Sequence, residues 1–253
     1  MEYEINEAIA KKVFETVEVG LCKGMGKPVA GQMCVEAAVC FALGLPHSDE
    51  PPCVGSAVRS YKITLNDAAW SSNSCRAKGM KLVSVAQLGS DQIDQKQFSN
   101  EVALGVINRI VPIALRSAAS LIPSHKDALE AAAVGCEIAI DLVTARAAAN
   151  AAYAAANAAR AARAAANAAY AAANAARAAR AAANAAYAAA NAAYAADAAA
   201  YAAEAAAYAA DAAAYAAAKD NVLSIAAQIA VDALKKLGSK GCEWLYLAEE
   251  PKS

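Results

Sequence analysis

The sequence predicts an all-α protein, with a helical N-terminal domain followed by a long Ala-rich helix or an antiparallel helical hairpin. Three observations lead to this prediction. Apolar residues recur at helical spacing in the first half of the chain. Between residues 124 and 237 there is no proline, and Gly135 is the only glycine. From 147 to 218, 52 of 72 residues are alanine, the best helix former.

The first two helices are expected in the first 44 residues. Residues 5–21 place apolar side chains on one face, with Glu and Lys between them, which predicts an amphipathic helix. The next apolar stretch, GQMCVEAAVCFALGL, runs to Gly44 and predicts a central buried helix. Gln32 and Glu36 are its strongly polar side chains.

Three further helices are expected before residue 123. Two lie in CVGSAVRSYKITL and WSSNSCRAKGMKLVSVAQLG, joined by Asn66 and Asp67 in a capping role. Within the first of them, Tyr61, Ile63 and Leu65 also alternate as in a strand. The third helix is expected at 95–119, with a kink at Pro112.

The sequence IPSHKD marks the main boundary, because Pro123 ends one helix and Ser124 with Asp127 resembles a capping box. We therefore expect a helical globular domain at 1–123 and a long Ala-rich arm or hairpin at 124–238. A C-terminal tail at 239–253 is expected to pack by Trp244.

The alanine tract is an internal repeat with a polar residue every 3.4 positions on average. On a straight helix this stripe drifts by roughly 100° per 17 residues, so the alanine face is not constant and supercoiled pairing is favoured. Antiparallel pairing about Tyr187 sets Arg163 opposite Asp211 and Arg177 opposite Asp197. The same register brings 138–143 against 231–236. A hairpin, an antiparallel dimer and a single long helix remain open.

One set of candidate binding residues lies in the first 73 positions: Glu36, His47, Asp67, Trp70 and Asn73. A carboxylate on an apolar helix is costly unless it is paired, so Glu36 is expected either to bind Arg59, Lys62 or another cation, or to face a cleft. The stretch LNDAAWSSN could form a polar pocket with an aromatic wall or a series of helix caps.

The cysteines support two chemical interpretations that remain open beside a structural one. Cys34, Cys40, His47 and Cys53 are of the types that zinc prefers, but their spacing matches no standard zinc module. Cys34 or Cys53 could instead act as a nucleophile, with His47 as base, Asp49 to orient it and Gln32 as an oxyanion donor. We expect buried structural thiols, with no metal and no cofactor.

Charge and cysteine usage restrict the partners and the compartment. A net charge of −1 gives no general attraction to nucleic acid or to an anionic membrane. The acidic N-terminus lacks the features of a signal peptide, and polar residues recur too often in the alanine tract for a membrane span. Seven cysteines without a CxxC pattern favour reduced thiols. We expect a cytoplasmic protein that binds neither nucleic acid nor membranes.

Several segments carry a resemblance: GQMCVEAAVCFALGLPHSDEPPCV, LNDAAWSSN, the alanine repeats and GSKGCEWL. Together they resemble uncharacterised Ala-rich bacterial and phage-associated proteins, and the repeat portion is similar to predicted immunity proteins of polymorphic toxin systems. The resemblance implies no catalytic residue. In composition the tract is also similar to type I antifreeze proteins, although it contains no threonine.

The functional expectation is a non-enzymatic helical interaction protein, with an immunity or inhibitor role as its most specific form. It would bind a protein partner, or self-associate, through the Ala-rich arm. A cysteine-dependent hydrolase is one alternative. An ice-binding or structural Ala-rich helical protein is the other.

Overall fold

The computed structural model describes residues 4–121, 125–161 and 219–248, and in these ranges it is helical, as predicted. No strand occurs in the described ranges, where an isolated bridge pairs Gly26 with Met33. The α-helices are α1 (Glu7–Glu18), α2 (Val35–Ala42), α3 (Ser56–Asp67), α4 (Asn73–Ala86), α5 (Gln95–Arg109), α6 (Val111–Leu121), α7 (Lys126–Glu137), α8 (Leu142–Ala161) and α11 (Lys219–Lys236). Two 3-10 helices, Ser90–Gln92 and η5 (Lys240–Ala248), complete the set.

The first two helices form as the apolar spacing predicts, but α2 is shorter than expected. The side chain of Asn6 caps α1 by accepting a hydrogen bond from the Ile9 amide at 3.1 Å. Helix α2 begins only at Val35, because Cys34 takes the extended conformation of an N-cap. Residues 31–34, which the sequence placed at the start of this helix, instead belong to the end of the preceding loop and the N-cap.

Residues 56–67 are helical, so the alternation around Tyr61 does not indicate a strand. Tyr61 and Leu65 lie one turn apart on the buried face of α3. The Tyr61 hydroxyl donates to the Ala226 carbonyl at 2.9 Å, and its ring meets Phe98 edge-on with centroids 6.3 Å apart. Helix α3 therefore connects α5 and α11 in the core.

The expected kink at Pro112 is present as a break between α5 and α6. Pro112 lies in the first turn of α6, where its missing N–H costs little. By length and composition, the run Gln95–Ser120 is long and apolar enough to cross a membrane, with mean hydropathy 1.4. In the structure 61% of its most apolar stretch is buried in the protein, as in the core helices of folded domains.

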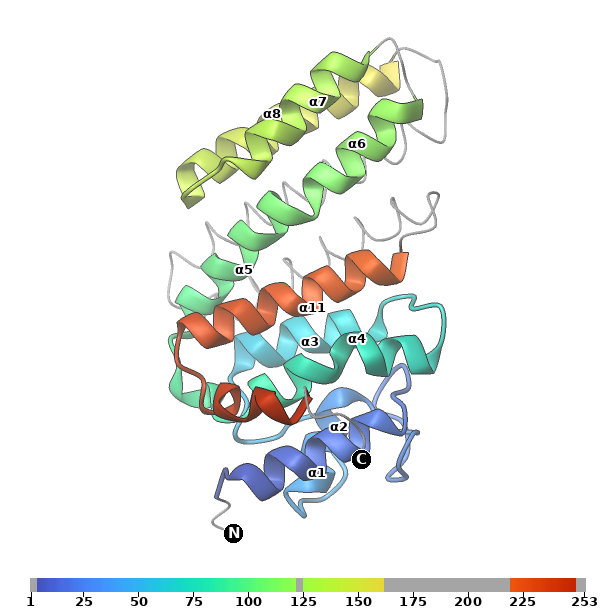
Figure 1. The fold of residues 1–253 in the computed structure, drawn as a ribbon, viewed down its shortest axis with the longest axis vertical. Helices are drawn as coiled ribbons and strands as arrows, with labels where there is room; N and C mark the ends of the chain where they lie inside the picture. The colour runs from blue at the N-terminus through green and yellow to red at the C-terminus, as the bar shows by residue number, and fades with distance from the viewer. Residues whose placement is uncertain (1–3, 122–124, 162–218, 249–253) are drawn as a thin grey trace.

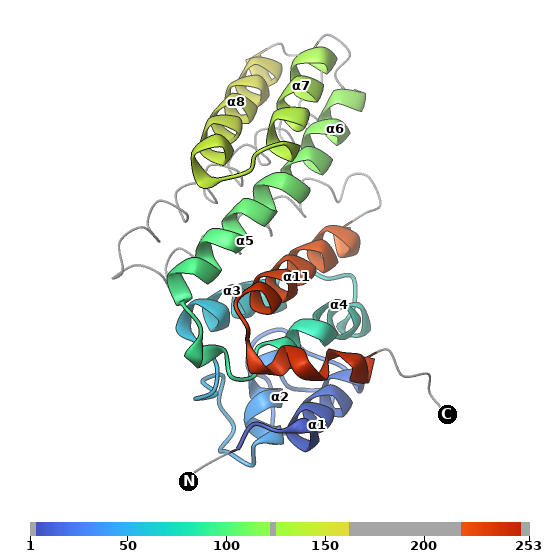
Figure 2. The ribbon, with the colours of Figure 1, turned by 60° about the vertical axis from the view of Figure 1, so that its left-hand side comes forward.

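The expected continuous helix from residue 125 onward is wrong in the described part, because the chain turns at 138–141. The Asp141 carboxylate accepts a hydrogen bond from the Thr144 amide at 2.7 Å, and the Thr144 hydroxyl accepts one from the Asp141 amide at 3.1 Å. This reciprocal cap starts α8. Helices α6, α7 and α8 then lie side by side at one end of the molecule (Figures 1 and 2).

Helix α11 packs with the N-terminal helices, which corrects the expected boundary that placed 124–238 in an arm. It lies between α4 and α5 and also contacts α3 (Figure 1). Val222, Leu223 and Leu234 are fully buried there. Helix η5 follows against α4 and α1, with Trp244 only 9% exposed. Residues 219–248 thus belong to the same core as α1–α5.

Candidate functional site

Glu36 and Lys62 form an ion pair with no exposed side-chain surface. The Lys62 ammonium nitrogen lies 2.7 Å from Glu36 Oε1, which confirms the ion-pair interpretation of Glu36. Glu36 Oε1 faces the ammonium, whereas Glu36 Oε2 has no hydrogen-bond partner among the described residues. Arg59, the alternative partner, lies 3.4 Å from Glu50 instead. The pair therefore retains unused hydrogen-bonding capacity inside the protein.

Burial acts on the two charges in opposite directions. Desolvation raises the pKa of Glu36 above its usual value, although the Lys62 charge works against this shift. Desolvation also lowers the pKa of Lys62, with the Glu36 charge again opposing the shift. For each group the partner's charge is the main influence that favours the ionised form, so removal of either partner leaves the other group buried without compensation.

A cavity of about 80 Å³ lies beside this pair. Five polar side chains line it: Cys34, Glu36, Asp49, Asn66 and Asp67. Gly24, Met25, Val35 and Ile63 supply the remaining wall. The structure therefore brings together two of the five predicted binding residues, Glu36 and Asp67, and adds Asp49.

The loop at 22–33 covers this cavity and is held by the end of α3. Asp67 accepts a hydrogen bond from the Gly24 amide at 2.8 Å, and the Asn66 amide group donates to the Cys22 carbonyl at 2.9 Å. Asn66 and Asp67 thus fasten the loop and do not cap α4, which corrects their expected role. Ser72 caps α4 instead, accepting from the Cys75 amide at 3.0 Å.

His47 also contacts the loop, and its ring nitrogen Nε2 lies 3.2 Å from the Gly26 carbonyl oxygen. It is not among the residues that line the cavity. Gly26 has a φ of 72°, and a side chain there would collide with the Gln32 carbonyl 2.0 Å away. Position 26 therefore requires glycine, because the backbone of the loop at Gln32 lies directly against it.

Trp70 and Asn73 lie outside the cavity lining, so the expected aromatic wall is not part of this cavity. The Trp70 indole N–H donates to the Leu65 carbonyl at 2.9 Å, and the ring occupies the space that a side chain at Gly79 would fill. Asn73 accepts a hydrogen bond from Arg76.

Sequence reasoning did not identify Arg76, which is 5% exposed and ties three segments together. Its Nε donates to the Asn66 carbonyl at 2.7 Å, and its Nη1 donates to the Leu21 carbonyl at 3.3 Å and to Asn73. Its position on a polar stretch of α4 gave no signal of burial.

The cysteines have the properties of structural thiols. All seven are free. Burial raises the pKa of Cys34 to about 11 and that of Cys53 to about 12, which is opposite to the activation of a nucleophile. Cys34 Sγ accepts a hydrogen bond from the Ala37 amide at the start of α2. No group of three or more His, Cys, Asp or Glu side chains in the described ranges could hold a metal ion.

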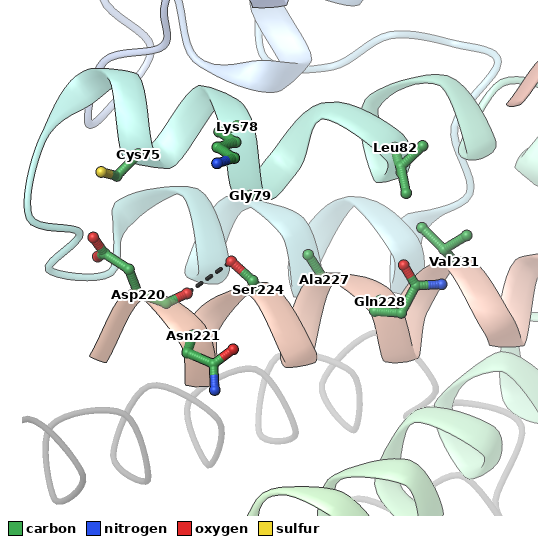
Figure 3. A pocket seen from close by; sticks show the side chains of 10 residues that line it. All are labelled: Cys75, Lys78, Gly79, Leu82, Asp220, Asn221, Ser224, Ala227, Gln228 and Val231. Atoms are coloured by element: carbon green, nitrogen blue, oxygen red, sulfur yellow. Dashed lines mark hydrogen bonds between the residues drawn. The ribbon is translucent and has the colours of Figure 1, made fainter. Parts of the chain in front are cut away.

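A larger groove of about 400 Å³ runs between α4 and α11 (Figure 3). Its walls include Gly79, Leu82, Ala227 and Val231. Two polar groups near its end, Asp220 and Ser224, are engaged within the protein. The Ser224 hydroxyl donates to the Asp220 carbonyl at 2.7 Å, and the Asp220 side chain accepts from the Ser71 amide at 2.9 Å.

Four large aliphatic side chains around the α7–α8 turn are exposed, and we call them the turn surface. Val134 is 47% exposed, Ile138 69%, Ile140 82% and Val143 78%. The expected pairing of 138–143 with 231–236 is therefore wrong, because Val231 and Leu234 are buried in the core while the turn surface faces outward. Helix α7 ends at Glu137, and the reciprocal cap of Asp141 and Thr144 starts α8 after the turn.

The turn surface is held in place by two contacts to preceding helices. The Asn108 amide on α5 donates to the Ala139 carbonyl at 2.6 Å and to the Glu137 carbonyl at 3.3 Å. Arg116 on α6 binds the Glu137 carboxylate through both Nη atoms, one at 2.8 Å, and its Nε lies 3.3 Å from Glu130. Charge-assisted bonds to Arg116 lower the pKa of Glu137.

The predicted arm-pairing residues Arg163, Arg177, Asp197 and Asp211 lie outside the described residues. In the described part of the Ala-rich segment, Ala145 and Ala152 are fully buried two turns apart, and α8 packs against α7 and α5. Close approach of alanine to neighbouring helices is therefore present at the start of the segment. No protein-family model, curated protein or solved structure matches this chain.

Proposed function

We propose that this chain is a helical binding protein that docks onto a protein partner through the turn surface at 134–143. The observation that supports the proposal is the exposure of Val134, Ile138, Ile140 and Val143 on adjacent helix ends. Clustered large aliphatic residues on a protein surface are typical of interaction sites, whereas single exposed ones are common everywhere. An immunity or inhibitor role would be a specific form of this binding.

Charge near the turn surface favours one kind of partner. Between 134 and 143 the charged side chains are Asp141 and Glu137, of which Glu137 is already bound by Arg116, and the segment itself has no basic residue. Hydrogen bonds from Thr144 lower the pKa of Asp141, so its carboxylate stays ionised at neutral pH. We infer that the partner offers an apolar groove with a basic side chain that faces Asp141, because an anionic lipid surface would repel this carboxylate.

Anchoring of the turn supports tight binding. The contacts from Asn108 and Arg116 and the cap at Asp141 fix the backbone of the turn before any partner arrives. A preorganised segment loses less conformational entropy on association than a flexible loop. The apolar side chains can therefore contribute more of their burial free energy to affinity.

The experiment compares the wild-type chain with the triple variant Ile138→Ser/Ile140→Ser/Val143→Ser. A protein captured by the wild type from its own cells is purified, and its affinity for both chains is measured by titration. We expect at least tenfold weaker binding by the triple variant, since three buried aliphatic contacts are lost. The control is Val19→Ser, at an aliphatic residue that follows the end of α1 and is 65% exposed.

Two results would contradict the proposal. One is equal affinity of the captured protein for the triple variant and the Val19→Ser control. The other is self-association of the purified wild type that the triple variant abolishes, since this would assign the turn surface to a second copy of the chain.

The hydrolase and ice-binding alternatives gain no support from the described residues. The raised pKa values of Cys34 and Cys53 leave their thiols protonated at neutral pH. The repeat on which ice binding would depend lies mostly outside the described residues.

A further inference from the structure

Gly135 lies in the interior of α7, where glycine is an unfavourable choice. It is the only glycine between residues 124 and 237. Glycine is disfavoured inside helices because it loses more backbone freedom on folding than other residues do and has no side chain to pack. Helix α7 would therefore be more stable with almost any other residue at this position, unless another requirement selects glycine.

The other glycines of the chain each have a local reason that Gly135 lacks. Seven of the twelve adopt a positive φ, between 66° and 140°, which residues with a side chain rarely adopt. Four more pack so closely that an added Cβ would lie 2.0–2.5 Å from a neighbouring atom. Gly135 has no positive φ, and apart from the adjacent backbone of α7 no described atom lies within 4 Å of the place a Cβ would take. Neither backbone conformation nor packing among the described residues requires glycine there.

Four residues share a solvent-facing side of α7, and we call them the Gly135 face: Ala131, Val134, Gly135 and Ile138. Their spacing is i, i+3, i+4 and i+7, which places them next to one another on a helix. Ala131 is exposed, Val134 is 47% exposed and Ile138 is 69% exposed. Open space above Gly135 thus lies beside two large aliphatic side chains that are accessible to a partner.

The opposite side of α7 is already used by the core. Leu129, Ala133 and Cys136 are fully buried, and α7 packs against α6 and α8, which lie on either side of it in Figure 2. The Gly135 face lies on the other side of the helix and continues into the turn surface. It is therefore free of the contacts that hold α7 in the protein.

A helix is the partner element that fits this face. When two helices pack, a side chain of one inserts among four residues of the other, and small residues at the contact allow the axes to approach to about 8 Å. A flat partner surface could not use the space above Gly135, because Val134 and Ile138 would hold it away. A protruding side chain reaches this space and contacts both aliphatic neighbours.

We propose that the Gly135 face receives a large apolar side chain, of the size of leucine or phenylalanine, from a helix of the partner protein. Gly135 is then a specificity-determining residue, which the chain keeps for binding at the expense of helix stability. The inference rests on the proposed function, because Val134 and Ile138 belong to the turn surface as well. It adds the kind of element that the partner contributes and the position at which shape selects it.

The test compares Gly135→Ala and Gly135→Leu with the wild type, first by thermal unfolding of the free chain. We expect both variants to have a Tm at least as high as that of the wild type. Alanine and leucine are better helix formers than glycine, and no described atom opposes the added side chain.

The same variants are then titrated with the purified protein that the wild type captures. We expect roughly fivefold weaker binding by Gly135→Ala and roughly fiftyfold weaker binding by Gly135→Leu, because each added side chain takes space that the partner's side chain would fill. Ala8→Leu is the matched control, since it adds an exposed leucine to α1 at the opposite end of the molecule (Figure 1). It is expected to bind as the wild type does. Weaker binding without a lower Tm would not come from a damaged fold.

Wild-type affinity in both Gly135 variants, together with weaker binding by Ile138→Ser/Ile140→Ser/Val143→Ser, would overturn this inference and leave the proposed function standing. Equal affinity of that triple variant and the Val19→Ser control would overturn both. A Tm of Gly135→Ala below that of the wild type would also overturn the inference, because the fold itself would then require glycine at this position.

Discussion

Among single residues, Glu36 and Lys62 have the largest expected effect on stability. Both side chains are completely buried, and their charges lie 2.7 Å apart. Removal of one partner from a buried pair is typically much more costly than replacement of both, because it leaves an uncompensated charge. The pair therefore constrains which substitutions α2 and α3 tolerate.

We predict that Lys62→Met lowers the free energy of unfolding by about 3 kcal/mol or more, whereas Glu36→Leu/Lys62→Met is close to neutral. The physical reason is that the double variant has no buried charge to desolvate. Urea unfolding of both variants and the wild type measures the difference. A double variant as unstable as Lys62→Met would show that the pair itself, and not charge balance, stabilises the fold.

The burial of Glu36 could be predicted from the apolar residues around it in α2. Which cation pairs with Glu36 could not be predicted. Arg59 and Lys62 lie three residues apart on α3, so both could reach α2 by sequence alone. The structure directs Lys62 inward and Arg59 toward Glu50. The hydrogen-bond partners of Asn66 and Asp67 could not be predicted either, because both residues bind a loop more than 40 residues away.

At the level of helices, the α7–α8 turn shows how a local cap overrides helix propensity. Alanine dominates the chain after residue 146, and propensity alone predicts one uninterrupted helix. Asp141 and Thr144 bind each other's backbone and start a new helix instead. These two residues are a sequence signal for a helix start, but this signal is weak beside a long run of strong helix formers.

The contact between Arg116 and Glu137 at this turn predicts that the stability of the fold depends on pH. Arg116 lowers the folded-state pKa of Glu137, so the interaction stabilises the fold above the ordinary pKa of a carboxylate. This stabilisation is lost as the pH falls through the lowered folded-state pKa. We expect the wild type to have a higher Tm than Arg116→Met at pH 6, and the difference to shrink below about pH 4.

Lys126→Met serves as the control, since it removes one exposed positive charge from α7 without touching Glu137. A Tm difference between wild type and Arg116→Met that stays constant from pH 6 to about pH 2.5 would contradict the assignment of this contact.

At the level of the whole molecule, the chain returns from the alanine tract to complete the core it started with. Helix α11 buries Val222, Leu223 and Leu234 against α3, α4 and α5, and η5 adds Trp244. The amphipathic pattern of this segment was visible in the sequence. The sequence did not show which helices this segment packs against, because the same apolar face could pack on an arm or on the N-terminal helices.

Because α11 lies in the core, truncation of the Leu234 side chain is expected to destabilise the protein. Leu234→Ala is expected to lower the free energy of unfolding by about 2–5 kcal/mol, because it leaves a cavity at a fully buried position. Val143→Ala, at a residue 78% exposed, should change it little. Chemical unfolding followed by tryptophan fluorescence measures both. Equal small effects would place α11 outside the core.

Hydrogen exchange of the full chain, with and without the protein captured by the wild type, tests the proposed binding surface most directly. The account predicts that protection on binding is concentrated at 134–143, where Ile138, Ile140 and Val143 are exposed in the free protein. Protection confined to the α4–α11 groove or to the 22–33 loop, with exchange at 134–143 unchanged, would contradict it.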